Sequence, residues 1–147
     1  MATTTATLSL TSSDLLSEPL SLTTTSSCYK AGTTIGLDQT AGLQRYYLTS
    51  ASGVDIVEEL ASSPSGANKN AKVYIANLNT ANDKDYVRVS IANSIIGDLY
   101  PGDWCWFPWS QNAQHADIEI APSVATGMWI EWMVIHEGHD LAAAADS

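Results

Sequence analysis

The sequence predicts an all-β protein, an antiparallel β-sandwich of jelly-roll-like form that carries a Thr/Ser-rich N-terminal strand pair or arm. Three observations favour this class. Short segments of alternating apolar and polar residues recur roughly every 10–15 residues. Turn-forming residues separate these segments, and no segment shows the apolar period of about 3.6 residues that marks an amphipathic helix. A chain of 147 residues, 45% of them hydrophobic, is most simply one compact domain.

The N-terminal part is rich in small hydroxyl side chains, since its first 34 residues contain seventeen Ser or Thr. Its leucines nevertheless keep a period of two, at Leu8 and Leu10 and again at Leu20 and Leu22. Residues 14–19 between them include turn-forming residues. We predict two Thr-rich strands joined by this loop, because threonine fits a pleated surface. The alternatives are a disordered arm and an arm, residues 1–27, that becomes ordered only on a partner.

Further strands follow from the same alternation. They are expected at residues 43–49, 72–77, 85–91, 103–109, 118–120 and 128–135. In the third of these segments Val87, Val89 and Ile91 should face inward. Residues 54–60 fit either a short strand or one helical turn.

The composition suggests three parts within one compact domain. Residues 1–61 form the Thr/Ser-rich β segment or arm, residues 71–137 the β-sandwich core, and residues 138–147 a frayed C-terminal tail. The clearest linker is residues 62–68, where Ser, Pro and Gly accumulate. Within the core, Pro101-Gly102 suits the two central positions of a type II turn.

Charge is distributed unevenly along the chain. The formal charge is −10, all six Lys and Arg lie at or before position 88, and eight Asp or Glu follow. Such a surface repels phosphate backbones, so we expect no nucleic-acid partner. The acidity either keeps an apolar domain soluble, which we favour, or docks on a basic partner. No apolar run is long enough to cross a membrane, and the N-terminus lacks the pattern of a signal peptide. We therefore also expect no disulfide between Cys28 and Cys105.

All five tryptophans lie between positions 104 and 132. In an extended strand Trp104 and Trp106 share one face, and Cys105 and Phe107 share the other. Both faces are apolar, whereas an antiparallel sheet with one wet face alternates apolar and polar residues. The second face should therefore be covered by another layer, another subunit or a ligand.

Two functions are open for this aromatic cluster. The first, which we favour, is a core and subunit-interface role, because aromatic residues dominate both kinds of burial. Its residues would be Trp104, Trp106, Phe107, Trp109, Trp129 and Trp132. In particular, Trp104, Trp106 and Trp109 should be buried by protein. The alternative is a glycan platform, because Trp104 and Trp106 would lie about 6–7 Å apart, which suits neighbouring pyranoses.

Few residues point to chemistry. Glu131 is the one charge in an apolar strand, and it either marks the solvent edge of the sheet, which we favour, or pairs with Arg45 or Arg88. The histidines of residues 136–139 are three apart and off any helix, so a surface turn is expected and not a metal site. Asp117 and Glu119 look like the wet side of a strand. We predict no catalytic, cofactor-binding or metal-binding residue, and hence no enzyme.

The chain resembles small structural proteins of tailed bacteriophages. The likeness is carried by an alternating strand ending in Asn, a Leu-x-Pro-Gly turn, a Pro-containing aromatic strand and a last strand carrying Glu. The segments are residues 73–77, 99–104 (LYPGDW), 107–109 (FPW), 117–120 (DIEI) and 129–132 (WIEW). The Thr/Ser-rich opening adds to it, and the likeness covers most of residues 1–137.

The resemblance implies a non-enzymatic virion component, made in the host cytoplasm and without cofactors. The first candidate is a capsid decoration (cement) protein that stabilises the phage head. Its expected partners are itself, as a homo-oligomer, and the major capsid protein. A tail, baseplate or fibre component is the alternative, in which the tryptophan-rich strand could bind glycan.

Overall fold

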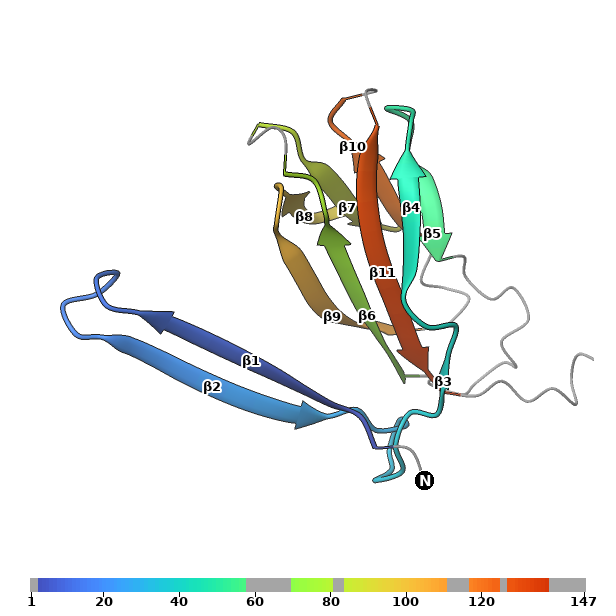
Figure 1. Ribbon diagram of the computed structural model, residues 1–147. Helices are drawn as coiled ribbons and strands as arrows, with labels where there is room; N and C mark the ends of the chain where they lie inside the picture. Colours follow the sequence, from blue (N-terminus) through green and yellow to red (C-terminus); the bar gives the residue numbers. More distant parts are fainter. Residues whose placement is uncertain (1–2, 58–69, 81–83, 111–116, 125–126, 138–147) are drawn as a thin grey trace, which may run out of the picture.

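The computed structural model describes residues 3–57, 70–80, 84–110, 117–124 and 127–137 (Figure 1). Within these ranges the chain forms strands and no helix, which confirms the predicted all-β class, and it holds no helix that could span a membrane. The strands are β1 (Thr5–Ser12), β2 (Leu20–Ser27), β3 (Gln39–Thr40), β4 (Gln44–Leu48), β5 (Val54–Val57), β6 (Asn70–Asn77), β7 (Val87–Ile91), β8 (Ser94–Leu99), β9 (Trp104–Ser110), β10 (Ile118–Pro122) and β11 (Met128–His136).

Strands β4 to β11 are paired in a nested order. The first pairs with the last (β4 with β11), the second with the seventh (β5 with β10), the third with the sixth (β6 with β9), and the two central strands form the hairpin β7–β8. All these pairs are antiparallel. Contacts of β11 with β6 and of β10 with β7 complete two sheets, β5-β10-β7-β8 and a five-stranded sheet that contains β3, β4, β11, β6 and β9. This nesting is the connectivity of a jelly roll.

The core lies between the two sheets. The five-stranded sheet contributes Val73, Ile75 and Ile130, and the opposite sheet contributes Val89 and Ile120, all at most 1% exposed. Each of these residues alternates with a more exposed neighbour, as expected for strands that bury one face. The inward orientation predicted for Val87, Val89 and Ile91 is confirmed, since the first two are buried and Ile91 packs against the same cluster.

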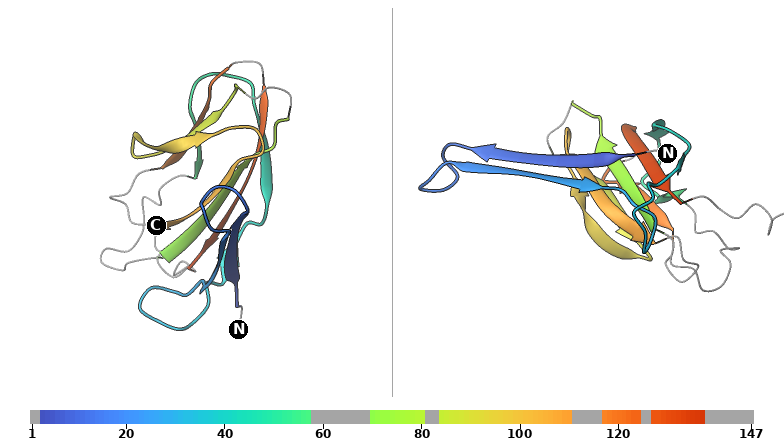
Figure 2. Two further views of the ribbon diagram at one scale, coloured as in Figure 1. Left: turned by 90° about the vertical axis from the view of Figure 1, so that its left-hand side faces the viewer. Right: turned by 90° about the horizontal axis from the view of Figure 1, so that it is seen from below.

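Strands β1 and β2 form a separate two-stranded sheet that projects from the lower end of the sandwich (Figures 1 and 2). The pairing is regular over eight residue pairs, and it places Leu10 directly opposite Leu22. Thr7 and Thr25, also opposite each other, join their hydroxyl groups at 2.9 Å. The prediction of two Thr-rich strands joined by a loop is therefore confirmed.

Two turns set the register of the sandwich. In the first, Asp103 N donates to Tyr100 O at 2.8 Å and Gly102 has a φ of 87°, which confirms the predicted type II turn at Pro101-Gly102. The second joins β7 to β8 through Ala92 and Asn93, with φ values of 53° and 61°. Positive φ at both central positions defines a type I′ hairpin turn.

The sandwich begins earlier than the expected boundary at residue 71. Strands β3, β4 and β5 lie within residues 1–61, yet they pair with β11 and β10. The sequence of β4 does not indicate this role, because β4 is an edge strand in which only Leu48 is buried and no alternation of apolar residues results. Residues 54–57 resolve to a strand, and β10 extends to Pro122. The expected linker at 62–68 and the tail at 138–147 lie outside the described residues.

Candidate functional site

The five-stranded sheet is apolar on both of its faces, although only one face packs against the opposite sheet. Its inner face supplies the core, and its outer face presents the alternate residues of the same strands. These include Tyr74 from β6, Trp104 and Trp106 from β9, and Met133 and Ile135 from β11. The aromatic strand was expected to be apolar on both faces, and β9 in the folded sheet has apolar residues on both.

The chain itself covers the lower part of this outer face. Cys28 and Leu37, both 1% exposed, form a second small core with Ile135. Trp106 and Met133 pack against that cluster from the sheet side. The loop that follows β2 thus serves as a partial second layer over the sheet.

Hydrogen bonds donated to one buried carboxylate fix this loop in place. Glu137, 7% exposed, accepts from Ala31 N at 2.7 Å and from Asn70 N at 2.8 Å. Asn70 Nδ2 in turn donates to Tyr29 O at 2.6 Å. The expectation of a surface turn at residues 136–139 is wrong for Glu137. Its partners lie 106 and 67 residues away, so no local pattern could have revealed them.

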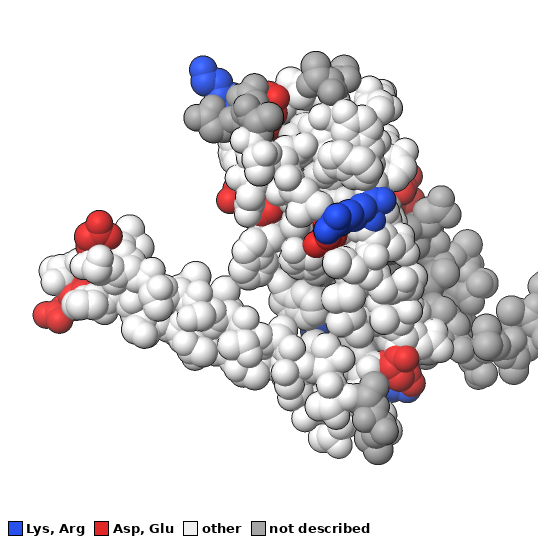
Figure 3. Space-filling model, viewed as in Figure 1, with Lys and Arg blue, Asp and Glu red and all other residues white. Residues whose placement is uncertain are grey.

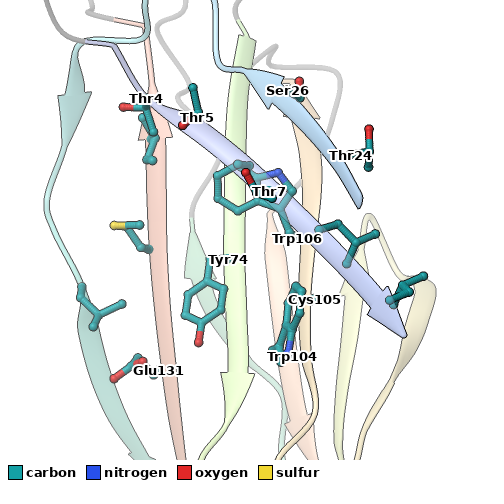
Figure 4. Close-up of a pocket in the computed structure, with 16 residues that line it drawn as sticks. Thr4, Thr5, Thr7, Thr24, Ser26, Tyr74, Trp104, Cys105, Trp106 and Glu131 are labelled. Carbon is teal, nitrogen blue, oxygen red and sulfur yellow. The ribbon is translucent and has the colours of Figure 1, made fainter. Parts of the chain in front are cut away.

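Above the covered part, a groove separates the hairpin from the outer face. It has a volume of about 970 Å³ and lies between the hairpin and strands β6, β9 and β11 (Figure 4). On the sheet side Tyr74, Trp104 and Trp106 line it. Ala6, Leu8 and Leu10 line the hairpin side, together with Thr and Ser residues. The groove is thus apolar on both walls.

The hairpin is amphipathic across its two faces. Directly opposed residues share a face, so the register places Leu10 with Leu22 and Ser12 with Leu20. We call this side the leucine face; its apolar residues are Ala6, Leu8, Leu10, Leu20 and Leu22, and Ser12, Thr24 and Ser26 share it. The other face carries only Ser and Thr. Leu10 and Leu22 are 44% and 45% exposed, and the leucine face therefore lacks a covering layer.

A single carboxylate lies in the groove, and it is neutralised. Glu131 is 8% exposed on β11, where it faces Arg45 of β4. Arg45 Nε donates to Glu131 Oε2 at 2.8 Å. The favoured expectation of a solvent edge is wrong, because β11 lies between β4 and β6 inside the sheet. The cation is Arg45, whereas Arg88 pairs with Asp98.

The aromatic residues singled out from the sequence fall into three environments. Trp109 is 5% exposed in the main core, and Phe107 and Trp132 pack against that core. Trp106 is half-buried under the covering loop. Trp104 and Trp129 are 53% and 49% exposed within the chain, so protein burial of Trp104 would need a partner. Trp129 lies against Tyr47, with 4.9 Å between ring centroids.

Sequence reasoning missed several groove residues. Tyr74 belongs to the outer face because it alternates with the buried Val73 and Ile75. Met133 was counted only as part of an apolar strand. The same test that singled out the tryptophans, apolar residues at both odd and even positions of a strand, would have found both.

The face of the molecule drawn in Figure 3 carries few charged side chains. Neither β1 nor β2 contains a charged residue, and the hairpin's only charges, Asp14 and Glu18, lie in the loop at its tip. The one ion pair of the groove is Arg45 with Glu131. The neutral area is notable on a chain whose formal charge is −10.

The titratable groups near the groove are held in their neutral or paired forms. Burial raises the pKa of Tyr74, and the nearby Glu131 carboxylate raises it further. Burial also raises the pKa of Cys105 to about 11 and raises that of Cys28. Both cysteines are free. Within the described ranges, no three His, Cys, Asp or Glu side chains come together as metal ligands.

The remaining predicted polar residues lie apart from the groove. Glu119 stands half-buried between Ile118 and Ile120, which are both fully buried in the opposite sheet. His136 Nδ1 lies 2.7 Å from Glu137 O at the end of β11, while His139 falls outside the described residues. Comparison with known families and with curated proteins finds no match to this chain.

Proposed function

We propose that this protein is a non-enzymatic structural component of a bacteriophage virion, a capsid decoration (cement) protein that stabilises the head. One observation carries the proposal. A hairpin with uncharged strands projects from the sandwich with Leu10 and Leu22 exposed, beside a groove whose aromatic wall includes the exposed Trp104. A two-stranded hairpin is marginally stable in water on its own. Surfaces of this kind are typical of a subunit that completes its packing against neighbours.

The fold agrees with this role by analogy. Jelly rolls occur among viral capsid domains and also among lectins, and a fold alone does not define a function. The sequence texture shared with phage structural proteins points to the first of these groups. The inert state of the groove also favours assembly over catalysis, because Glu131 is tied to Arg45 and Tyr74 is kept protonated.

Labelling of particles tests the proposal. Antibody raised against the purified protein, coupled to gold, should decorate the heads of phage particles banded from the source culture. Gold on tails would support the tail or baseplate alternative. Particles that contain no copy of the protein, by labelling and by peptide mass spectrometry, would overturn the assignment to a virion.

A second candidate is glycan binding by a tail, baseplate or fibre component. It is favoured by the exposed pair Trp129 and Tyr47, whose rings stand 4.9 Å apart on the outer face. Stacking on sugar needs such accessible aromatic faces. Host polysaccharide should then quench tryptophan emission in the wild type but not in Trp129→Ala, with the circular dichroism spectrum of that variant unchanged. An unchanged emission spectrum at saturating polysaccharide would exclude this candidate.

A further inference from the structure

We propose that the groove of one copy receives the β1–β2 hairpin of a second copy, whose leucine face packs on Trp104, Trp106 and Tyr74. The inference rests on the proposed function, since it names the partner and the contact by which such a subunit would assemble. It goes further in specifying that the two surfaces are complementary parts of one joint. Each copy therefore offers both an arm and a receptor.

The hairpin needs a cover that its own chain does not provide. Leu10 and Leu22 face each other across the hairpin and are each nearly half exposed. Near the tip, Leu15 and Leu16 are 71% and 58% exposed. Apolar side chains grouped in this way mark a surface that binds another surface. The sheet wall of the groove, formed by Trp104, Trp106 and Tyr74, needs an apolar covering surface, and the leucine face supplies one.

The hairpin's own base prevents it from closing onto its own sheet. Cys28 N donates to Thr4 O at 2.9 Å, which joins the two strands below the last regular pair. Tyr29 then pairs with Gly36, and the loop they enclose is held by Glu137 and Asn70. These bonds fix the direction in which the hairpin leaves the sandwich. The hairpin therefore projects away from the upper parts of β6 and β9, as Figure 1 shows.

The charge distribution is compatible with a second copy as the occupant and gives no advantage to a basic partner. Two molecules of formal charge −10 repel each other over most of their surfaces. The strands of the hairpin carry no charge, and the groove carries only the neutralised pair Arg45 and Glu131. Contact between the hairpin of one copy and the groove of another brings no like charges together. A basic partner would gain nothing from this neutral groove.

The length of the hairpin and the packing already present on the outer face are both compatible with this contact. The eight residues of β1 span about 26 Å, a length comparable with that of β6, which has eight residues, and β11, which has nine. The lower outer face already accepts Cys28 and Leu37 as a second layer. A hairpin from a second copy would continue that layer upward over Trp104.

Paired substitutions test the arm. Leu10→Asp with Leu22→Asp places two charges on the leucine face near the tip. The matched control, Thr11→Asp with Ser21→Asp, places the same charges at the neighbouring directly opposed pair on the other face. Light scattering should show a multimer for the wild type and the control, and an association weaker by about a hundredfold or more for the leucine variant. Equal weakening in both variants would contradict the inference, because simple repulsion would explain it.

Mixing tests the complementarity. Trp104→Asp destroys the groove and leaves the arm, while the double leucine variant destroys the arm and leaves the groove. Each alone should be monomeric, and an equimolar mixture should form heterodimers. Trp129→Asp, on the same face but outside the groove, should still self-associate. A mixture that stays monomeric overturns the inference, as does a wild type that is monomeric at every concentration.

The mixing experiment and the labelling of particles can fail independently, so they test the arm exchange and the proposed function separately. Failed complementation together with gold on phage heads would remove the arm exchange and leave the decoration role. Complementation without any labelled particle would leave a self-assembling protein outside a virion.

Discussion

Arg45 and Glu131 stand directly opposite each other on β4 and β11, and the guanidinium Nε donates to the carboxylate at 2.8 Å. The two side chains differ sharply in environment, since 64% of the Arg45 side chain is exposed and 10% of the Glu131 side chain. The arginine thus neutralises a carboxylate at the floor of the groove from the solvent side. Without it, the apolar groove would contain an unpaired buried charge.

Removing the arginine should therefore destabilise the protein. Arg45→Met leaves Glu131 buried without its charge-assisted hydrogen bond, and we expect a loss of about 1–3 kcal/mol in the free energy of unfolding. Urea denaturation measures it. Adding Glu131→Met should recover most of the loss, because the charge is then gone as well. A double variant less stable than Arg45→Met would show that the pair is not the cause.

The type I′ turn offers a stabilising change. Ala92 has a φ of 53°, a left-handed conformation that costs a residue with a Cβ about 1–2 kcal/mol. Ala92→Gly should raise the free energy of unfolding by about 1 kcal/mol, less than the full strain because glycine gains entropy in the unfolded chain. Ala92→Ser, which keeps the Cβ, serves as control and should give no gain. A destabilised glycine variant would contradict the turn geometry.

Both thiols should resist modification in the folded protein. With a pKa of about 11, roughly one thousandth of Cys105 is ionised at pH 8, and only the thiolate reacts. Cys28 is buried and its pKa is raised as well. A disulfide-exchange reagent should therefore titrate almost no thiol in native protein and two thiols per chain in urea. Rapid native reaction would mean that one of the two sites is open to solvent.

Removing the Glu137 carboxylate should release the base of the hairpin before the sandwich. Glu137→Ala leaves the amides of Ala31 and Asn70 without their acceptor, at a cost of about 1–3 kcal/mol. Cys28 should then react with the thiol reagent much faster than in the wild type, while Cys105 stays protected. Glu119→Ala, a half-buried carboxylate in the opposite sheet, is the control. Equal acceleration at both cysteines would indicate global unfolding and not local release.

Acid should weaken the ion pair of the other sheet. Arg88 donates to Asp98 at 2.8 and 3.0 Å, and these hydrogen bonds hold the pKa of Asp98 below its ordinary 3.8. A lowered carboxyl pKa stabilises the folded state above about pH 4, and the contribution is lost as the pH falls through 3.8 and the folded pKa. Wild type should therefore exceed Asp98→Asn in stability at pH 6, with the difference shrinking below pH 4. A difference between the two proteins that does not shrink on acidification would show that the Asp98 carboxylate is not its cause.

Local patterns were sufficient for most of the strands. Val87 and Val89 alternate with polar neighbours, and both proved to be fully buried. Strand β8 was not anticipated, because Ile95 and Ile96 follow each other and both are exposed on an edge strand. The turn before it was equally hidden, since Ala92 is not a residue that favours positive φ.

The site depended on long-range contacts that no window of sequence contains. The sequence indicated that Trp104 and Trp106 share an apolar face, but not that the N-terminal hairpin would face them across a groove. The loop after β2 determines that arrangement through Glu137. The partner of Glu131 was similarly one of two candidates until the register of β4 with β11 distinguished them.

Pro108 lies within β9, an edge strand of the five-stranded sheet. Proline is tolerated in an edge strand where its missing N–H would have faced solvent, and an incoming strand finds no donor there. The missing donor therefore disfavours extension of one continuous sheet across this edge, the route by which β-rich proteins polymerise into fibrils. The strand that carries Trp104 and Trp106 thus also carries a residue that opposes growth of its own edge into a continuous ribbon.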